Sequence, residues 1–362
     1  MKIAYIANVR MPTEKAHGAQ IMKTCEALAK AGADVELIVP NRKTPIRESP
    51  HDYYGVKTPF TITRLPVVDT IGLGPVGFWV ESVLFAHAVR RYLRDKKSDV
   101  IYGRDEVVLA RVPGRRVWES HTGAWNAAAR KIAGQTYALI TITQGLKDFY
   151  VEKGVPTGKI FVAADGIDLD DFAHPESKED ARKRLGLPAG KKIAMYIGRL
   201  DGWKGSETLL TSSSALPDDV QVVIIGGEHE QAVSLQSKYP RVRFLGFRPY
   251  RQLADNQAAA DVLILPNTGK DEISARFTSP LKLFTYMASG RPIVASDLPS
   301  IREVLDESCA YFVPPDDAQA LARAIGAALE DSASPQKAAR ARELVVSYTW
   351  SARAEMILRA LR

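Results

Sequence analysis

The stretch MYIGRLDGWKGSETLL, residues 195–210, joins an apolar run to a helical pattern through a glycine-rich turn. The apolar run predicts a buried strand that ends at Gly198, and a helix is expected soon after Lys204. Arg199 and Lys204 therefore stand in a short turn between a strand end and a helix start. Backbone amides, the positive end of a helix dipole and fixed cations favour a phosphate ester. We predict a phosphate-binding turn.

Short apolar runs alternate with helical patterns along all 362 residues. The first helix is expected at about 17–31, with Gly32 as its C-cap. Continuous apolar runs are typical of parallel strands with both faces covered, so the alternation predicts doubly wound α/β domains. The expected strands are 2–8, 34–39, 60–68, 99–102, 116–119, 137–143 and 159–164, followed by 191–198, 221–227, 242–246, 262–266, 292–296 and 310–313.

A polar stretch rich in charge, Pro and Gly, residues 165–192, separates the two series of strands. This composition is typical of a domain connection with one short helix. We therefore predict two Rossmann-like domains, residues 1–170 and 171–347, that face each other across a cleft. The tail, residues 348–362, is expected to pack back on the first domain. Ligands of such sheets bind at the carboxyl ends of the strands, which places the Arg199–Lys204 turn at the cleft.

The composition is that of a soluble globular protein, with 46% hydrophobic and 25% charged residues. The net charge of +7 is uneven, because residues 1–164 carry +9 and the remainder −2. A basic half suits an anionic membrane, nucleic acid or an acidic substrate, although solubility alone also explains it. Cys25 and Cys309 are far apart, which favours a reducing compartment. No signal peptide and no membrane span are expected, so we predict a cytoplasmic protein.

Several familiar motifs are present in unsuitable places. GLGPVG, residues 72–77, has dinucleotide-binding spacing, but that motif should follow the first strand of a sheet; a glycine-rich loop before a helix is the better interpretation. GWKGS lacks the Ser or Thr after Lys204 that a P-loop needs. Asp168 and Asp170 lie in the polar connection without a third ligand, and no zinc spacing occurs. We expect no metal site and no cofactor.

Three further segments carry weaker signals for ligand binding. Gly18 stands at the start of the first helix, where backbone amides can meet an anion, although such a glycine is more often part of a turn. His121 follows a predicted strand, where a histidine is more often structural. Ser279 and Pro280 open a later helix, with Lys282 in its first turn. An ordinary helix start explains this last pattern equally well.

The ordered set HGAQ, ESHTG, ITQGLKDFY, ADGIDLDDF, YIGRLDGWKG, IIGGEHE, FLGF, ADVLILPN, SPLKLFTYMASGRPIVASD and YTWSARAE resembles glycosyltransferase family 4, group 1. The resemblance covers essentially the whole chain. It implies a GT-B fold in which the first domain binds the acceptor and the second binds a nucleotide-sugar donor. It also implies retention of the anomeric configuration without a required metal.

The resemblance also implies a role for each matching residue. Arg199 and Lys204 would bind the donor diphosphate, Gly18 would approach the same phosphates, and His121 would sit beside the donor sugar. The base would be held by backbone groups of Phe247 and Arg248. The distal phosphate or sugar would meet the helix start, namely Ser279, Pro280, Leu281 and Lys282.

Two glutamates common in the family are absent. Alignment on MASGRP puts Phe277 and Thr285 in their places. Thr285 can still bond a ribose hydroxyl, but not through two carboxylate oxygens. On this basis Thr285→Glu would tighten nucleotide binding if the pocket has room. Asp271 and Glu272 are candidates to replace the first carboxylate, although a mobile polar loop is the safer interpretation.

The sequence therefore predicts a retaining glycosyltransferase with a UDP- or GDP-sugar donor. The acceptor would be a glycan, a glycolipid or a small sugar, and we expect no nucleic-acid partner. The alternatives are a nucleotide-sugar-binding protein without turnover and a nicotinamide-dependent oxidoreductase. In residues 76–97, bulky apolar residues precede a basic cluster, a pattern that suits peripheral contact with the inner membrane face. A crossover helix that buries its apolar face explains the same pattern.

Overall fold

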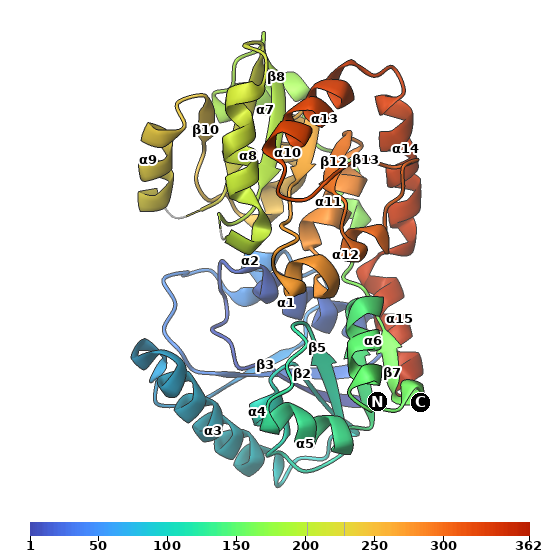
Figure 1. The fold of residues 1–362 in the computed structure, drawn as a ribbon. Coiled ribbons are helices and arrows are strands. Elements are labelled where there is room, and N and C mark those ends of the chain that lie inside the picture. Colours follow the sequence, from blue (N-terminus) through green and yellow to red (C-terminus); the bar gives the residue numbers. More distant parts are fainter. Residues whose placement is uncertain (201, 228) are drawn as a thin grey trace. The chain divides into compact units, whose positions relative to one another are not determined.

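The computed structural model describes residues 1–200, 202–227 and 229–362. By its internal contacts the chain divides into two compact units (Figure 1). Unit 1 comprises Met1–Asp165 and Trp350–Arg362, and unit 2 comprises Gly166–Thr349. Each unit holds a parallel sheet with helical connections, so the α/β class and the two doubly wound domains are confirmed.

The sheet of unit 1 has seven parallel strands in the order β3-β2-β1-β4-β5-β6-β7. The order reverses between β1 and β4, which is where ligands bind in open parallel sheets. Ile3 pairs with Val35 on one side and with Val100 on the other. The strands are β1 (Lys2–Ile6), β2 (Asp34–Pro40), β3 (Thr61–Leu65), β4 (Val100–Gly103), β5 (Arg116–Ser120), β6 (Ala138–Thr141) and β7 (Ile160–Val162).

The sheet of unit 2 has six parallel strands in the order β10-β9-β8-β11-β12-β13. Its order reverses between β8 and β11, so the strand that precedes Arg199 lies at the switch point. The bounds of each strand agree with its predicted range to within two residues. The strands are β8 (Lys192–Ile197), β9 (Val220–Ile225), β10 (Val242–Phe244), β11 (Val262–Leu265), β12 (Ile293–Ser296) and β13 (Tyr311–Val313).

Helices follow most strands and cover the sheets. In unit 1 they are α1 (Ala16–Lys30), α2 (Pro50–Tyr54), α3 (Gly74–Leu93), α4 (Glu106–Leu109), α5 (Ala127–Gln135), α6 (Gln144–Glu152) and α15 (Trp350–Ala360). In unit 2 they are α7 (Lys178–Leu185), α8 (Ser206–Ser212), α9 (His229–Lys238), α10 (Leu253–Ala258), α11 (Leu281–Ser289), α12 (Pro299–Arg302), α13 (Ala318–Glu330) and α14 (Ser334–Leu344).

The predicted end of the first helix is confirmed. The amide of Gly32 donates to Ala29 O and that of Ala33 to Leu28 O, and Gly32 has a φ of 89°. This pair of bonds is a Schellman motif, in which the left-handed residue is usually glycine.

The segment Ile71–Leu93 differs from what the sequence indicates. We expected no segment long and apolar enough to cross a membrane. Ile71–Leu93 is long and apolar enough by length and composition alone, and 28% of its most apolar 18-residue stretch is buried. The tail passes from α14 through a short 3-10 turn, η8 (Val345–Ser347), into α15, which belongs to unit 1 and packs on α1.

Candidate active site

The carboxyl end of β8 forms the centre of the candidate site in unit 2. Arg199 follows Gly198 directly and is exposed, while its carbonyl accepts a hydrogen bond of 2.8 Å from the Tyr196 hydroxyl. Lys204 ends the 3-10 turn η4 (Gly202–Lys204) and is half-buried, immediately before α8. The predicted strand–turn–helix therefore places both cations at the switch point of the sheet.

The start of α11 lies against the same strand end. Lys282 Nζ donates to the Tyr196 hydroxyl at 3.0 Å and lies 4.2 Å from the centre of the Tyr196 ring. The Tyr286 hydroxyl, one turn further along α11, accepts from the Ile197 amide at 2.8 Å. No side-chain bond caps this helix start at Pro280, and Ser279 just before it is buried. The structure therefore brings Ser279, Pro280, Leu281 and Lys282 together with the loop of Arg199.

Close backbone packing holds this end of the sheet together. A Cβ on Gly226, after β9, would lie 2.2 Å from Gly198 O, and the Gly226 amide donates to Gly246 O at 2.8 Å. A Cβ on Gly205, at the start of α8, would lie 1.6 Å from Pro266 O, after β11. Loops that follow four neighbouring strands thus meet at backbone distance, which leaves main-chain groups beside the cations.

The turn predicted to hold the base of the donor follows β10. Phe247 and Arg248 are exposed in the turn after β10, and Arg248 Nη1 donates to Phe247 O at 3.0 Å. Gly246, which precedes them, is bonded to Gly226 as described above. The turn therefore belongs to the same end of the sheet, with its side chains directed to solvent.

Thr285 does not have the environment expected of a ribose-binding residue. It is 3% exposed, its hydroxyl accepts from Gln257 Nε2 at 2.9 Å, and it donates to Lys282 O at 3.0 Å. Both bonds are internal to unit 2, so we do not retain Thr285 as a ligand contact. Phe277, at the other family glutamate position, is buried.

The two acidic residues considered as replacements serve the local backbone. Asp271 Oδ1 accepts from the Ile273 and Ser274 amides at 2.8 and 3.2 Å, at the start of the π-helix η7 (Ile273–Phe277). Glu272 pairs with Arg276 at 3.2 Å. These bonds order the segment at the start of η7, so the structure shows neither the mobile polar loop expected from the sequence nor a carboxylate free of local partners.

Sequence reasoning missed one polar residue in this unit. Asn267, two residues after β11, is fully buried, and neither its side-chain oxygen nor its nitrogen has a hydrogen-bond partner among the described residues. A buried, unpaired amide is costly and uncommon. Its position after the apolar run of β11 is the signal that could have identified it.

In unit 1, His121 belongs to a buried charge network. Its Nε2 lies 2.5 Å from Glu119 Oε1, and Gln20 Nε2 donates to the same oxygen at 2.8 Å. The other oxygen, Glu119 Oε2, accepts from the Tyr102 hydroxyl and pairs with Arg353 Nη2 at 2.8 Å. Glu119 is fully buried at the end of β5, and Arg353 reaches it from α15. Sequence analysis identified His121 but neither Glu119 nor Arg353.

The network fixes the charge states around His121. Burial alone would raise the pKa of Glu119, but Arg353, His121 and Arg104 outweigh it and hold that pKa well below its usual range. Burial and the charge of Arg104 lower the pKa of His121 to about 4. The imidazole is therefore neutral at pH 7. An ionised Glu119 can only accept, so Nε2 carries the proton and Nδ1 is the acceptor.

Gly18 has a packing role that the sequence did not indicate. Its amide donates to Lys15 O at 2.9 Å, and a Cβ would lie 2.1 Å from the Tyr54 hydroxyl. Tyr54 also bonds the Thr13 amide and carbonyl, so it holds the loop before α1. The contact with Tyr54 accounts for this glycine, and we do not retain its amide as a phosphate contact.

A cavity of about 670 Å³ lies at the carboxyl ends of the central strands of unit 1. Its lining is rich in charge of both signs and includes apolar residues. The charged residues are Arg10, Lys15, Arg42, Lys43 and Arg104, together with Glu14, Asp69, Asp105 and Glu106; the apolar ones include Ile71 and Phe78. Burial raises the pKa of Asp105 to about 6.

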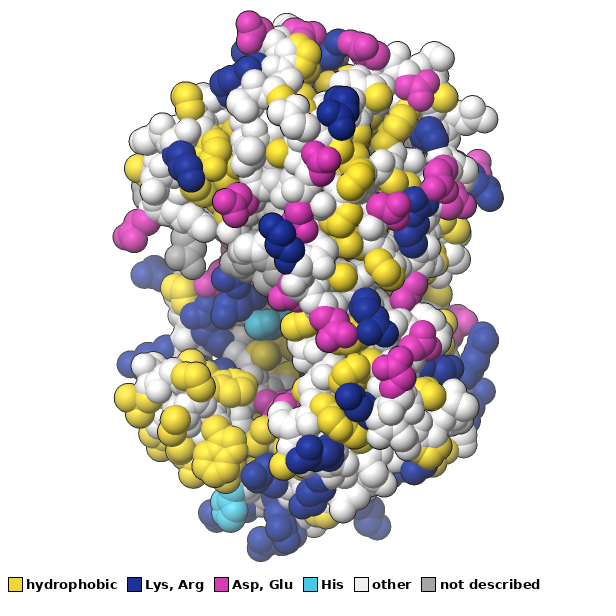
Figure 2. Space-filling view, viewed as in Figure 1, with side chains coloured by type: hydrophobic (Ala, Val, Ile, Leu, Met, Phe, Trp, Pro, Cys, Tyr) yellow, Lys and Arg dark blue, Asp and Glu magenta, His cyan; other side chains and the backbone are white. Residues whose placement is uncertain are grey.

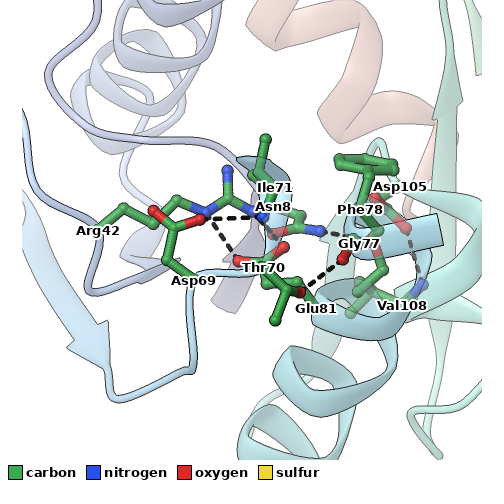
Figure 3. A network of polar contacts seen from close by, with 11 residues as sticks. Asn8, Arg42, Asp69, Thr70, Ile71, Gly77, Phe78, Glu81, Asp105 and Val108 are labelled. Carbon is green, nitrogen blue, oxygen red and sulfur yellow. Dashed lines mark hydrogen bonds and ion pairs between the residues drawn. The ribbon is translucent and has the colours of Figure 1, made fainter. Parts of the chain in front are cut away.

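Hydrogen bonds tie the start of α3 to the wall of this cavity (Figure 3). Arg42 Nε donates to Glu81 Oε1 at 2.7 Å, and Arg42 Nη2 donates to Asn8 Oδ1 at 2.6 Å. Asn8 Nδ2 donates in turn to Ser82 Oγ at 2.8 Å. GLGPVG forms the turn η1 (Ile71–Leu73) and the start of α3, after β3, so it is a loop before a helix as interpreted above.

Two family models match the chain. Glycosyltransferase Family 4 covers residues 18–171, and Glycosyl transferases group 1 covers residues 191–331. The chain belongs to the glycosyltransferase family that these two models describe together. Among its described residues, no three His, Cys, Asp or Glu side chains are grouped so that they could hold a metal ion.

Relatives of the glycosyltransferase include mycobacterial mannosyltransferases. A phosphatidyl-myo-inositol mannosyltransferase of Mycobacterium leprae is 29% identical over 75% of each chain. A GDP-mannose-dependent alpha-mannosyltransferase of Mycobacterium tuberculosis is 26% identical over 84% of this chain and 81% of that one. Both names agree with the family assignment.

Solved structures show the same fold. HepE of Anabaena in complex with UDP and glucose has a TM-score of 0.79 at 18% identity and covers 100% of this chain and 99% of its own. Sucrose-phosphate synthase of Thermosynechococcus elongatus has a TM-score of 0.76 at 22% identity, over 99% and 97%. The predicted GT-B fold is confirmed.

Proposed function

We propose that this glycosyltransferase transfers a hexosyl group from a nucleoside-diphosphate sugar to a hydroxyl acceptor with retention of configuration. Unit 2 would bind the donor and the cavity of unit 1 the acceptor. The observation that carries the donor assignment is the convergence at the end of β8 of Arg199, Lys204, Lys282 and the start of α11.

The chemistry of transfer makes use of these cations. Cleavage of the sugar–phosphate bond moves an electron pair onto the leaving phosphate, where negative charge grows. Arg199, Lys204 and Lys282, with the amides at the start of α11, would stabilise that charge as it develops. The leaving phosphate would take the proton of the attacking hydroxyl on the same face of the sugar, so configuration is retained. We propose that no metal is needed.

We propose a polyhydroxylated acceptor. Four carboxyl groups and five cations line the cavity of unit 1, and both kinds of side chain bond hydroxyl groups well. Relatives are named for a phosphatidyl-myo-inositol and for a D-inositol 3-phosphate, which supports a polyol acceptor. Neutral His121, held by Glu119, would present Nδ1 as a hydrogen-bond acceptor to a sugar hydroxyl.

A direct binding experiment identifies the base of the donor. UDP-, GDP- and ADP-sugars are titrated into the protein by calorimetry, and nucleotide release and product configuration are followed with the donor that binds. One base is expected to bind clearly, without added divalent metal and in the presence of a chelator. Binding without release would instead indicate a nucleotide-sugar-binding protein, and binding of a nicotinamide dinucleotide would indicate an oxidoreductase.

A cytoplasmic location is part of the proposal. Cys25 and Cys309 are free thiols buried in different units, which agrees with a reducing compartment.

A further inference from the structure

Helix α3 carries an unusual exposed surface. Large hydrophobic side chains on it and just before it are exposed to solvent: Val68 by 65%, Leu73 by 75%, Val76 by 72%, Phe78 by 42%, Trp79 by 53% and Leu84 by 43%. Figure 2 shows a continuous hydrophobic area over α3, at the lower left of the view. A contiguous exposed apolar surface of this kind usually marks an interaction site, whereas hydrophobic residues exposed singly are normal.

The exposed side of α3 changes from apolar to basic along its length. Residues at helical spacing form one stripe, which runs Val76, Val80, Val83, His87, Arg90 and Arg94. Arg91 flanks the basic end, and Arg90, Arg91 and Arg94 are all exposed. The acidic residue of this helix, Glu81, is fully buried. The stripe therefore presents apolar bulk and positive charge without a negative side chain of the same helix.

The opposite side of α3 is fixed to unit 1. Glu81 is paired with Arg42, and Ser82 bonds Asn8, while Phe85 and Val89 are fully buried. Withdrawing α3 to cross a bilayer would leave Arg42 and Asn8 without these partners and would expose Phe85 and Val89. The helix is thus held in place to lie on a membrane, although its length and composition also suit a span.

We infer that α3 docks unit 1 on an anionic lipid bilayer. The first half of the helix, with Trp79, enters the boundary between headgroups and acyl chains, and Arg90, Arg91 and Arg94 meet the lipid phosphates. The charge complementarity selects anionic lipid over a second copy of this chain, because two such basic stripes would repel each other.

Docking in this way places the cavity of unit 1 at the membrane. Ile71 and Phe78 line that cavity and lie at the apolar end of α3. A lipid-anchored acceptor would then offer its head group to the cavity from the bilayer; this second step rests on the proposed function.

The test is co-sedimentation with vesicles of phosphatidylcholine alone or mixed with phosphatidylglycerol, at low and high salt and without donor. Binding is expected only with the anionic vesicles and is expected to fall with salt. Because each basic side chain near an anionic surface is worth about fivefold in affinity, Arg90→Gln/Arg91→Gln/Arg94→Gln should weaken binding about 10²-fold. Val76→Ser/Trp79→Ser should weaken it by about 10-fold or more.

Matched control variants remove the same kinds of side chain, basic or apolar, from other exposed positions of unit 1. Arg130→Gln/Lys131→Gln/Lys153→Gln removes three exposed charges from α5 and the end of α6, and Tyr137→Ser/Val151→Ser removes two exposed apolar groups. Both should bind like the parent protein, with unchanged thermal unfolding.

Three results would overturn the inference. They are a lack of vesicle binding, equal binding to neutral vesicles with no effect of the arginines, and concentration-dependent self-association that Val76→Ser/Trp79→Ser abolishes. Vesicle binding without nucleotide release from any donor would leave the docking intact and would refute the proposed function instead.

Discussion

Arg199 and Lys204 are the side chains at which the proposed chemistry can be tested most directly. Each is expected to contribute to charge stabilisation in the transition state and little to the fold, because Arg199 is exposed and Lys204 half-buried. Arg199→Ala and Lys204→Ala should therefore lower turnover on the order of 10²-fold or more. Nucleotide release under saturating donor measures this effect.

Lys191→Ala provides the control for both variants. Lys191 is exposed just before the opposite end of β8, so its loss changes the same charge away from the switch point. All three variants should unfold at nearly the same temperature. Near-normal turnover of Arg199→Ala or Lys204→Ala would contradict the phosphate assignment.

His121 predicts a specific dependence of stability on pH. Its pKa is lowered to about 4 in the folded protein, against an ordinary value of about 6.5. The unfolded chain therefore binds a proton first as the pH falls. The stability that this group contributes is complete above about pH 6.5 and is lost between about pH 6.5 and 4, by up to about 3 kcal/mol.

Comparison with His121→Gln isolates this effect. Urea unfolding at several pH values should show a free-energy difference between the two proteins that shrinks below about pH 6, since other groups cancel. Asp105 and Asp165, whose pKa values burial raises to about 6, act in the opposite direction in both proteins. A difference independent of pH would show that His121 titrates normally.

The turn between β8 and α8 depends on Gly205. Its φ is 69°, and a Cβ would lie 1.6 Å from Pro266 O. Gly205→Ala should therefore destabilise unit 2 by at least about 2 kcal/mol and also weaken donor binding, because the loop after β11 must move. Thermal unfolding and donor titration measure the two effects.

Gly190→Ala is the control for this turn. Gly190 lies in the turn before β8, and a Cβ there would have no described atom within 4 Å. It should leave both the unfolding temperature and donor affinity unchanged. If Gly205→Ala behaved in the same way, the close packing of the loops would not matter for the site.

Helix α11 gives a prediction opposite to the one from sequence. Thr285 is buried beside Gln257, so Thr285→Glu would place a carboxylate among groups that are internal to unit 2. We expect the variant to be destabilised by several kcal/mol and to bind nucleotide more weakly. Thr285→Val keeps the shape and removes the hydroxyl's bonds to the Gln257 amide and the Lys282 carbonyl without burying a charge, so it should cost less. Tighter nucleotide binding by Thr285→Glu would restore the ribose assignment.

The chain returns from unit 2 to complete unit 1 with α15. Arg353 pairs there with Glu119 at 2.8 Å and donates to the Ala163 and Ala164 carbonyls. Arg353→Met would leave Glu119 buried without this counter-ion, which typically costs about 3–5 kcal/mol. Unit 1 should then unfold at a lower temperature than in the parent protein.

The double variant Arg353→Met/Glu119→Gln separates pairing from packing. If the ion pair is the cause, neutralising both partners should recover much of the lost stability. His121 would also lose its charged acceptor, so the double variant should turn over more slowly than the parent protein even where stability returns. Equal stability of the single and double variants would argue against the pair.

Local patterns in the sequence determined a large part of this protein. The strands, their division into two series and the strand–turn–helix at Arg199 follow from apolar runs and turn residues, which act over a few neighbouring positions. The order of short motifs along the chain was enough to identify the glycosyltransferase family. Arg199 and Lys204, in such a turn after a strand, were therefore recognisable as candidates for binding a phosphate.

Tertiary structure decided what depends on contacts between distant residues. Gly18 packs on Tyr54, Thr285 bonds Gln257, and Arg353 reaches Glu119. In each case the partner lies far along the chain, and burial sets the role. The same holds for α3, whose sequence suits both a core helix and a helix at a membrane surface. The fold buries Phe85 and Val89 and exposes Trp79. Periodicity shows which residues share a helix face, whereas only the packed structure shows which face is covered.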